Sequence, residues 1–148
     1  MGYLKKTIRN KKATFNYETI EKYTAGIILT GCEVKSIRDS SVNVSDTFCY
    51  IKDNALWVKN MKISRYNRSH PSVIHEENRD KKLLLKKVEI NKIKKQTKDL
   101  GKTIILLNII VGRKIKIQIA TAKGKREYDK RQDIKKRDLE RDMRRSLY

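Results

Sequence analysis

Hydrophobic and polar residues alternate along two neighbouring segments in the first half of the chain, and this period of two is typical of half-buried β-strands. In the first segment, residues 42–51, four apolar side chains share one face: Val42, Val44, Phe48 and Tyr50. In the second, residues 55–63, the shared face holds Trp57, Met61 and Ile63. Asp53 and Asn54 separate the two segments, so together they predict a β-hairpin. We interpret Trp57 as a core residue, with a base-stacking platform as the alternative.

Further strands are predicted on both sides of this hairpin. Apolar residues cluster in Ala25–Thr30 and in Leu83–Leu85, and Ile104–Val111 is apolar on both faces, as expected of a central strand. In the next segment every second residue points inward, at Ile115, Ile117 and Ile119. These patterns predict about five or six short antiparallel strands.

Three short helices are predicted between the strands. Each has an apolar or aromatic face: Tyr17, Ile20 and Tyr23 in the first, Val34 and Ile37 in the second (Cys32–Asp39), and Ile90, Ile93, Thr97 and Leu100 in the third. Asn16 is placed to cap the first helix, and Gly101 suits the position just after the third.

These elements predict a mainly β fold with short helices: a small antiparallel β-barrel of oligonucleotide-binding type plus a basic C-terminal tail. We expect residues 1–121 to form the barrel body, with a mobile basic arm over residues 1–12, and residues 122–148 to form the tail. Residues 65–82 are polar and without a period, which predicts a long loop. His70 and His75 in this loop are expected to bond to water or to backbone.

The tail differs from the body because its regular apolar positions are only Leu139, Met143 and Leu147, four residues apart. So narrow a stripe cannot support a free helix in water, where most helix stability comes from packing. We therefore expect the tail to be disordered alone and to become helical only against a partner.

Charge points to the kind of partner. The chain has 37 Lys and Arg against 17 Asp and Glu, a formal net charge of +20. Residues 121–148 hold 11 basic and 6 acidic residues, which leaves 26 and 11 in residues 1–120, so the excess is +5 in the tail and +15 in the body. Phosphate neutralisation and counterion release make a polyanion the default partner of such a surface. The alternative is a solvated surface in a lysine-rich proteome.

Other functions are disfavoured. No apolar run is long enough to predict a transmembrane helix, and the first residues lack the apolar core of a signal peptide, so we expect a cytoplasmic protein without membrane contact. Cys32 and Cys49 are too few and too far apart for a disulfide scaffold or a zinc site. No glycine-rich phosphate loop or catalytic triad spacing is found, and we expect neither enzyme activity nor a cofactor.

Three segments, in order and spacing, resemble the SsrA-binding protein family, SmpB. They read AGIILTGCEVKSIRDSSVNVSDTF (Ala25–Phe48), KKLLLKKVEI (Lys81–Ile90) and AKGKREYDKRQDIKKRD (Ala122–Asp138). This combination of motifs is highly specific, and the resemblance extends over nearly the whole chain from Asn10.

The resemblance implies a barrel that binds the tRNA-like domain of transfer-messenger RNA. It implies delivery of that RNA, charged with alanine, to stalled bacterial ribosomes for trans-translation, the rescue and tagging of incomplete proteins. The body would support the elbow of the tRNA-like domain, while the tail would enter the empty decoding centre and message channel and fold there as a helix. The expected partners are transfer-messenger RNA, the stalled ribosome with its small-subunit RNA, and elongation factor Tu with GTP through the RNA. We expect the protein to be a monomer.

The resemblance also implies two sets of functional residues. The RNA-binding residues of the body are Asn10, Lys11, Lys12, Gly31, Glu33, Lys35, Ser36, Arg38, Leu84, Lys116, Lys123 and Lys125. Leu84 is expected to support this surface from beneath. The tail residues that engage the decoding centre are Tyr128, Asp129, Lys130, Arg131, Ile134, Lys135, Arg137 and Asp138.

The physical reading of these residues agrees with the resemblance. Gly31 lets a backbone approach RNA closely, and Lys35 and Arg38 share a side that suits phosphates. The alternative for that pair is an ordinary connecting helix with solvated charges. Tyr128 is suited to stack on an exposed base, or alternatively to close the open end of the barrel.

Two positions depart from the family pattern. Thr24 stands where the family usually has an acidic residue, and the segment His75–Arg79 lacks the family's proline, with Glu77 in its place.

Two other classes of protein fit part of the pattern. They are a ribosomal or initiation-type protein on the same barrel, and a basic nuclease that would cleave RNA with a metal ion.

Overall fold

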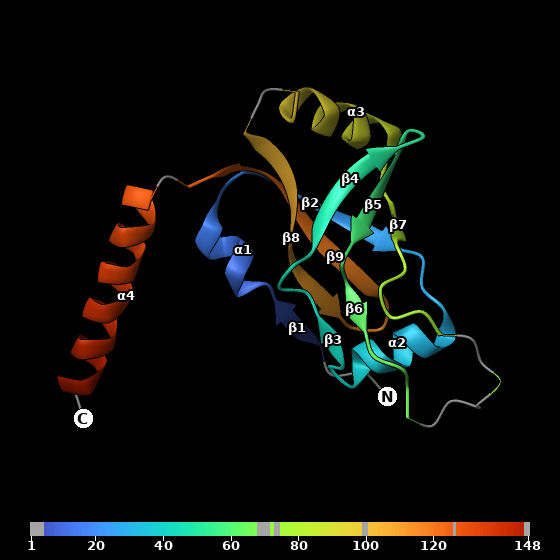
Figure 1. Ribbon diagram of the computed structural model, residues 1–148, viewed down its shortest axis with the longest axis horizontal. Coiled ribbons are helices and arrows are strands. Elements are labelled where there is room, and N and C mark those ends of the chain that lie inside the picture. The colour runs from blue at the N-terminus through green and yellow to red at the C-terminus, as the bar shows by residue number, and fades with distance from the viewer. Residues whose placement is uncertain (1–4, 68–71, 73–74, 99–100, 126, 147–148) are drawn as a thin grey trace.

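The computed structural model describes residues 5–67, 72, 75–98, 101–125 and 127–146. Within these ranges the chain forms nine strands and four helices (Figure 1). The strands are β1 (Lys6–Arg9), β2 (Tyr17–Ile27), β3 (Val42–Asn43), β4 (Phe48–Lys52), β5 (Ala55–Lys59), β6 (Lys62–Ile63), β7 (Lys81–Leu84), β8 (Lys102–Val111) and β9 (Ile115–Gly124). The helices are α1 (Lys11–Asn16), α2 (Gly31–Arg38), α3 (Lys87–Gln96) and α4 (Glu127–Ser146). None of these helices is long and apolar enough to span a membrane.

Six strands close into an antiparallel barrel. Their order is β8-β4-β5-β7-β2-β9, and the pairing of β9 with β8 returns the ring to its start. Strand β4 joins β8 through one register pair, Cys49 with Ile104, and β1 pairs with the far end of β8. The fold expected from the sequence, a small antiparallel β-barrel with short helices, is therefore confirmed, although its strands are more numerous than expected and β2, β8 and β9 are longer.

The barrel interior is filled by aliphatic side chains from every wall, and they form one buried cluster. Strand β8 is apolar on both faces for a further reason. Its outer residues Ile105 and Leu107 pack with Ala13 of α1 and with Ala120 and Ala122 of β9 in a second cluster. Helix α1 therefore covers part of the outer surface of the barrel.

The N-terminal segment differs from the prediction. The cap of the first helix is Asn10, whose Oδ1 accepts a hydrogen bond from the Ala13 backbone N–H at 3.2 Å. The helix ends at Asn16, and the residues that follow it form β2, so the prediction of a helix capped by Asn16 was wrong. Pairing of β2 with β7 and β9 on its two sides outweighs the local helical spacing. The expected mobile arm is β1 over residues 6–9.

The predicted hairpin is confirmed as β4 and β5, and the left-handed backbone of Asp53 and Asn54 (φ 52° and 56°) forms its tight turn. The predicted core face is confirmed for Val44, Met61 and Ile63, which are buried in the core, but it was wrong for Phe48, Tyr50 and Trp57. Cys49, Leu56 and Val58 point into the core, which places Phe48 and Trp57 on the outer face. Trp57 is half-buried there, and its Nε1 donates to the Lys52 carbonyl at 3.3 Å.

Both hairpin segments are interrupted, which the alternation did not predict. Asn60 has a left-handed φ of 63° between β5 and β6. On the other side, a turn closed by Thr47, whose Oγ1 donates to the Val44 carbonyl at 2.6 Å, separates β3 from β4. Strands β3 and β6 then pair with each other as a separate small sheet.

Helices α2 and α3 lie at opposite ends of the barrel (Figure 1). Helix α3 buries Ile90 and Ile93, as predicted, and its Gln96 accepts a hydrogen bond at Oε1 from the Tyr23 hydroxyl at 2.7 Å. The helix ends with Thr97 as its cap, so the prediction that Gly101 follows it directly was wrong. Gly101, with φ 85°, directly precedes β8. Leu100 lies outside the described residues.

Helix α4 leaves β9 and extends beside α1, apart from the barrel (Figure 1). Strand β9 continues past the boundary expected at residue 121, because Ala122 is buried and pairs with both β2 and β8. The structure shows the tail in helical form, and its disorder in the absence of a partner stays a prediction.

Candidate nucleic-acid interface

Helix α2 begins with a reciprocal cap. Thr30 Oγ1 accepts from the Glu33 backbone N–H at 3.3 Å, and Glu33 Oε1 accepts from the Thr30 backbone N–H at 2.9 Å. The same Glu33 oxygen lies 2.6 Å from Arg79 Nη2, and Lys81 Nζ lies 3.9 Å from the other carboxylate oxygen. Glu33 is 1% exposed. Burial therefore corrects the expectation of a direct RNA contact, because this carboxylate joins α2 to the chain before β7.

The electrostatics of this cluster follow from its burial. Burial favours the neutral form of Glu33, but the Thr30 backbone N–H and the Arg79 guanidinium outweigh it, so the pKa of Glu33 is lowered. Burial lowers the pKa of Lys81, and the neighbouring Glu33 carboxylate opposes that shift. Lys81 Nζ also donates to the carbonyls of Met61 and Arg79, at 2.8 and 2.7 Å. The cluster holds its charges by mutual pairing and backbone contacts.

Arg38 joins α2 to the β8–β9 hairpin. Its Nη1 donates to the Gly112 carbonyl at 2.9 Å and its Nη2 to the Arg113 carbonyl at 3.2 Å. Lys6 Nζ donates in turn to the Arg38 carbonyl. Ser36, on the same helix, is buried, so its expected direct RNA contact is corrected in the same way as that of Glu33. Arg38 has a structural role in addition to its positive charge.

A groove of about 380 Å³ lies between α2, β7 and the β8–β9 hairpin, and we call it the hairpin groove. Its lining residues are Gly26, Ile27, Leu29, Val34, Arg38, Leu84, Arg113, Lys114, Ile115 and Lys116. Gly26 pairs with Leu84 on one side and with Lys116 on the other. A Cβ on Gly26 would lie 3.3 Å from Leu84 Cβ, so the glycine makes room for that side chain. The lining of the groove thus combines apolar side chains with four cations, Arg38, Arg113, Lys114 and Lys116.

Leu84 itself was predicted to lie beneath the binding surface. The structure places it on the surface, 52% exposed, so that prediction was wrong. Strand β7 directs Leu83 into the core, and the period of two therefore turns Leu84 outward.

The remaining α2 residues are accessible. Lys35 is exposed, and its Nζ lies 5.4 Å from the centre of the Tyr66 ring. Gly31 is exposed at the first position of the helix, and a Cβ placed there would meet no atom within 4 Å, so its backbone is open to a partner. Both placements suit a partner that approaches α2 from solvent.

Residues of α1 and the end of β9 form a different part of the surface. Asn10 is buried, and its Nδ2 donates to the Leu106 carbonyl at 2.9 Å, so it positions α1 rather than contacting RNA directly as expected. Lys11 is exposed, and Lys12 pairs with Asp46 at 2.8 Å. Two further predicted residues, Lys123 and Lys125, follow on β9 and just beyond it. The Lys125 backbone N–H donates to the Asn16 carbonyl at 2.9 Å, which fixes where the tail leaves the body.

The predicted tail residues lie on α4. The side chains of Tyr128, Asp129 and Lys130 are outside the described part of the structure. The side chains of Arg131, Ile134, Lys135 and Asp138 are exposed. The Arg137 guanidinium lies 5.3 Å from the centre of the Phe15 ring on α1. The structure therefore does not gather the tail residues with those of the hairpin groove.

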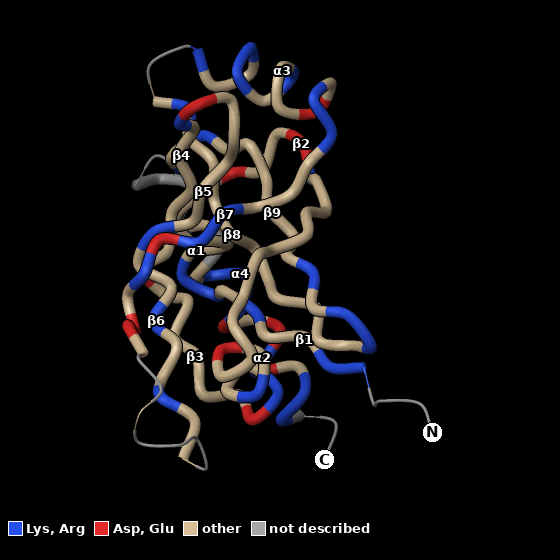
Figure 2. The backbone as a smooth tube through the Cα atoms, turned by 90° about the vertical axis from the view of Figure 1, so that its right-hand side faces the viewer, with Lys and Arg blue, Asp and Glu red and all other residues tan. Residues whose placement is uncertain are grey.

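Sequence reasoning missed four cations near the groove and the α2 cluster: Arg79, Lys81, Arg113 and Lys114. Arg113 and Lys114 occupy the predicted turn between two apolar strands, so their place at the groove was available from the hairpin pattern. Lys81 had no such signal, because a lysine at the start of a strand is expected in solvent. Figure 2 shows Lys and Arg spread over the body and along α3, which agrees with the excess of basic residues that the sequence has in the body as well as in the tail.

Comparisons with known proteins agree with this arrangement. The family model described as SmpB protein matches residues 7–148. The SsrA-binding protein of Bacteroides thetaiotaomicron is 48% identical over 138 residues, which cover 92% of this chain and 91% of the relative. The SsrA-binding protein of Cytophaga hutchinsonii is 46% identical over 140 residues, with 93% and 91% covered.

A solved structure is also similar. It is described as "tmRNA-SmpB: a journey to the center of the bacterial ribosome" and matches with a TM-score of 0.67 at 30% identity. The match covers 86% of this chain and 94% of the solved one. Sequence and fold therefore agree over the barrel as a whole.

Proposed function

The chain belongs to the SmpB family, and from that membership we propose that it binds the tRNA-like domain of transfer-messenger RNA and delivers it to stalled ribosomes for trans-translation. The body binds the RNA, and the tail reads the empty decoding centre and message channel. The protein acts by binding rather than by catalysis. It works in the cytoplasm as a monomer, and its connection to elongation factor Tu and GTP runs through the RNA.

The hairpin groove is the observation that best supports RNA binding by the body. Folded RNA is recognised largely by shape, through phosphates, 2′-hydroxyls and exposed bases. The Arg113, Lys114 and Lys116 side chains provide cations for phosphates, and Leu84 provides an apolar contact among them. Lys35 adds a further accessible cation on α2. This mixture fits a non-helical part of an RNA better than a uniform duplex.

The tail supports a second binding event. Its apolar residues Ile134, Leu139 and Met143 are 46%, 61% and 64% exposed on α4, and basic residues surround them. A helix with so much unburied apolar surface gains stability when a partner covers it. A ribosomal RNA channel supplies both the walls and the negative charge.

The experiment that tests the proposal is recovery of RNA bound to the affinity-tagged full chain from bacterial cells, followed by sequencing. We expect transfer-messenger RNA to be the enriched species. Enrichment of ribosomal RNA in cells that lack transfer-messenger RNA would favour the ribosomal-protein alternative. Metal-dependent cleavage of labelled RNA by the pure protein would favour the nuclease alternative.

A matched pair of double variants locates the binding surface. Leu84→Ala with Lys116→Ala removes one apolar and one cationic side chain from the hairpin groove. Val88→Ala with Lys95→Ala removes the same two types from the exposed face of α3. We expect the groove variant to weaken binding of the tRNA-like domain and to reduce the salt slope by about one unit. Equal effects of the two variants would remove the groove from the proposal.

A further inference from the structure

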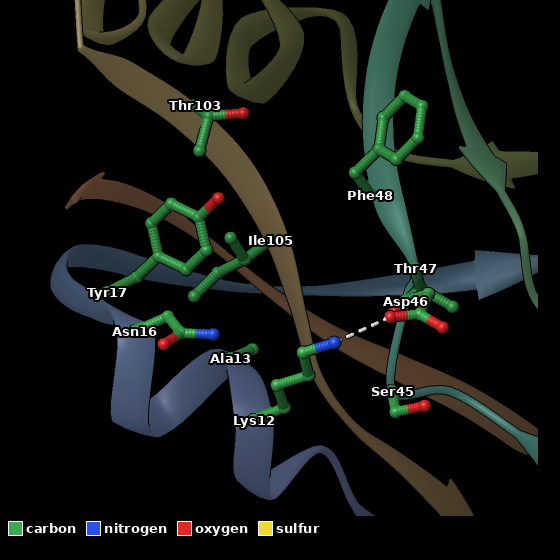
Figure 3. Close-up of a pocket in the computed structure, with 10 residues that line it drawn as sticks. All are labelled: Lys12, Ala13, Asn16, Tyr17, Ser45, Asp46, Thr47, Phe48, Thr103 and Ile105. Atoms are coloured by element: carbon green, nitrogen blue, oxygen red, sulfur yellow. Dashed lines mark hydrogen bonds and ion pairs between the residues drawn. The ribbon is translucent and has the colours of Figure 1, made fainter.

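A second pocket lies at the other end of β8 from the hairpin groove. Helix α1 covers the outer face of β8 but stops short of β4, and a pocket of about 210 Å³ remains between them (Figure 3). Its lining residues come from four elements and the turn before β4: Lys12, Ala13, Asn16, Tyr17, Ser45, Asp46, Thr47, Phe48, Thr103 and Ile105. Of these, only Lys12 belongs to the RNA-binding residues that the resemblance implies, although residues 45–48 are the end of the first family segment.

Two aromatic rings border this pocket. Figure 3 shows Tyr17 on one side and Phe48 on the other, with Ile105 between them. Phe48 is 41% exposed although its neighbour Cys49 is buried. An exposed aromatic ring beside a second ring offers faces on which a flat π-system can stack. The volume is below the roughly 300–1,000 Å³ of sites for larger ligands, so one ring system fits better than a whole cofactor.

Polar groups stand at the edge of the same pocket. The Asn16 carboxamide and the Thr103 hydroxyl both line it, and Figure 3 shows Thr103 on β8 above Ile105 in the view and Asn16 on α1 below it. A carboxamide can donate one hydrogen bond and accept another at the same time, and the edge of a nucleobase carries the matching acceptors and donors. The Asn16 backbone is fixed at this position, because its backbone carbonyl accepts a hydrogen bond from the Lys125 backbone N–H.

The surrounding charge favours an anionic ligand. Lys12 Nζ pairs with Asp46 at 2.8 Å beside the pocket, and this neutralises the one carboxylate of the lining. Lys11 precedes Lys12 at the start of α1, and Lys102 lies opposite Lys123 in the register of β8 and β9. Phosphates on either side of a bound base would meet these lysines.

We propose that this pocket binds one unstacked nucleobase of an RNA, between Tyr17 and Phe48, with the base edge toward Asn16 and Thr103. The inference rests on the proposed RNA-binding function and adds a base-binding site separate from the hairpin groove. A base that is flipped out of a folded RNA, or belongs to a single strand, meets this requirement, whereas a base inside a duplex does not. The site is tolerant of sequence, because stacking contributes more than edge recognition.

The test uses the full chain and a short single-stranded RNA that contains one 2-aminopurine, whose fluorescence falls when it stacks. Phe48→Leu keeps an apolar side chain but removes the ring, and Phe48→Tyr keeps the ring. We expect fluorescence quenching in the wild type and in Phe48→Tyr, and an affinity about tenfold weaker with little quenching in Phe48→Leu. Equal binding and quenching by Phe48→Leu and the wild type would overturn the proposal.

A second measurement locates the base. Uridine and adenosine monophosphates are titrated into the isotope-labelled full chain, and backbone amide shifts are followed by NMR. Shifts at Asn16, Phe48 and Thr103 support the pocket, whereas shifts confined to the hairpin groove overturn it. Failure of the wild-type chain to bind the tRNA-like domain would contradict the proposed function instead.

Discussion

Glu33 Oε1 lies 2.6 Å from Arg79 Nη2, so a mostly buried ion pair joins the first turn of α2 to the chain just before β7. Lys81, fully buried, is the second cation near the same carboxylate. Because both cations depend on one acid, the position of α2 depends on the charge of Glu33.

Glu33→Gln should therefore destabilise the body. The change removes the carboxylate but leaves Lys81 buried, and loss of one partner of a buried pair costs about 3 kcal/mol or more. The free energy of unfolding in urea measures the loss. Glu77→Gln is the control, because its pair with Lys62 spans 3.7 Å at the surface and should contribute less than about 1 kcal/mol. Similar losses in the two variants would contradict the role given to Glu33.

Lowering the pH should reduce stability through the same carboxyl group, that of Glu33. The folded-state pKa of Glu33 is lowered, so its contribution to stability is present above the unfolded pKa and is lost as pH falls through the folded value. We expect the wild-type chain to lose more stability than Glu33→Gln as the pH is lowered below about 4. Parallel stability curves for the two proteins, measured by urea unfolding across the acidic range, would show that Glu33 is not the titrating group.

The boundary between body and tail can be tested by truncation. A chain that ends at Lys125 keeps all of β9, whereas a chain that ends at Thr121 loses the buried Ala122 and its pairs on both sides. We expect the longer body to retain the melting temperature and the RNA affinity of the full chain, and the shorter body to melt several degrees lower. Circular dichroism and filter binding provide the two measurements. An RNA affinity lost with the tail alone would contradict the assignment of binding to the body.

Lys35 and Arg38 should behave differently even though they share a helix face. Lys35→Ala should reduce the salt slope of RNA binding by about one unit and leave stability unchanged, because the Lys35 side chain reaches solvent. Arg38→Ala should also loosen the β8–β9 hairpin, since the guanidinium donates to the carbonyls of Gly112 and Arg113. Amide hydrogen exchange in residues 110–116 distinguishes the two effects. Unchanged amide hydrogen exchange in Arg38→Ala would show that Arg38 does not stabilise the hairpin and contributes only its positive charge.

Tyr23 should ionise at a higher pH than an ordinary tyrosine. Burial, together with the nearby Glu21 carboxylate, raises its pKa to about 12. A raised pKa means that the folded state holds the proton more tightly, so stability is retained below about pH 10 and falls as the pH rises toward 12. Spectrophotometric titration of the phenolate absorbance checks this. Tyr23→Phe should remove the late step, and its persistence in that variant would assign it to another residue.

The sequence predicted the fold class because long apolar patterns carry most of the information about it. Ile104–Val111 and the isoleucines from Ile115 to Ile119 became β8 and β9, two long neighbouring walls of the barrel. Local signals were less reliable. The first helix is capped by Asn10 rather than by Asn16, because tertiary pairing draws the residues after Asn16 into β2. Single-residue spacing cannot show which strands will be neighbours.

The face of a strand is the hardest property to predict, because a shift of one residue exchanges its two sides. Phe48 and Trp57 are large and apolar, so the alternation assigned them to the core, yet Cys49 and Leu56 occupy it. The proposed base pocket would explain part of this reversal, since Phe48 borders it. For Glu33 and Arg38 the motif correctly directed attention to α2, but only the structure shows that one is buried and the other holds a hairpin.

Strands from the two ends of the chain are partners in the sheet: β2 pairs with β9 in the barrel wall, and β1 adds to β8. During synthesis, the N-terminal strands must therefore wait, unpaired on these edges, until nearly the entire chain has been translated. Contacts so distant in sequence slow folding and leave strand edges open to association with other chains. A charged side chain on an edge strand opposes such association, and Lys6 and Arg9 on β1 are placed to do so.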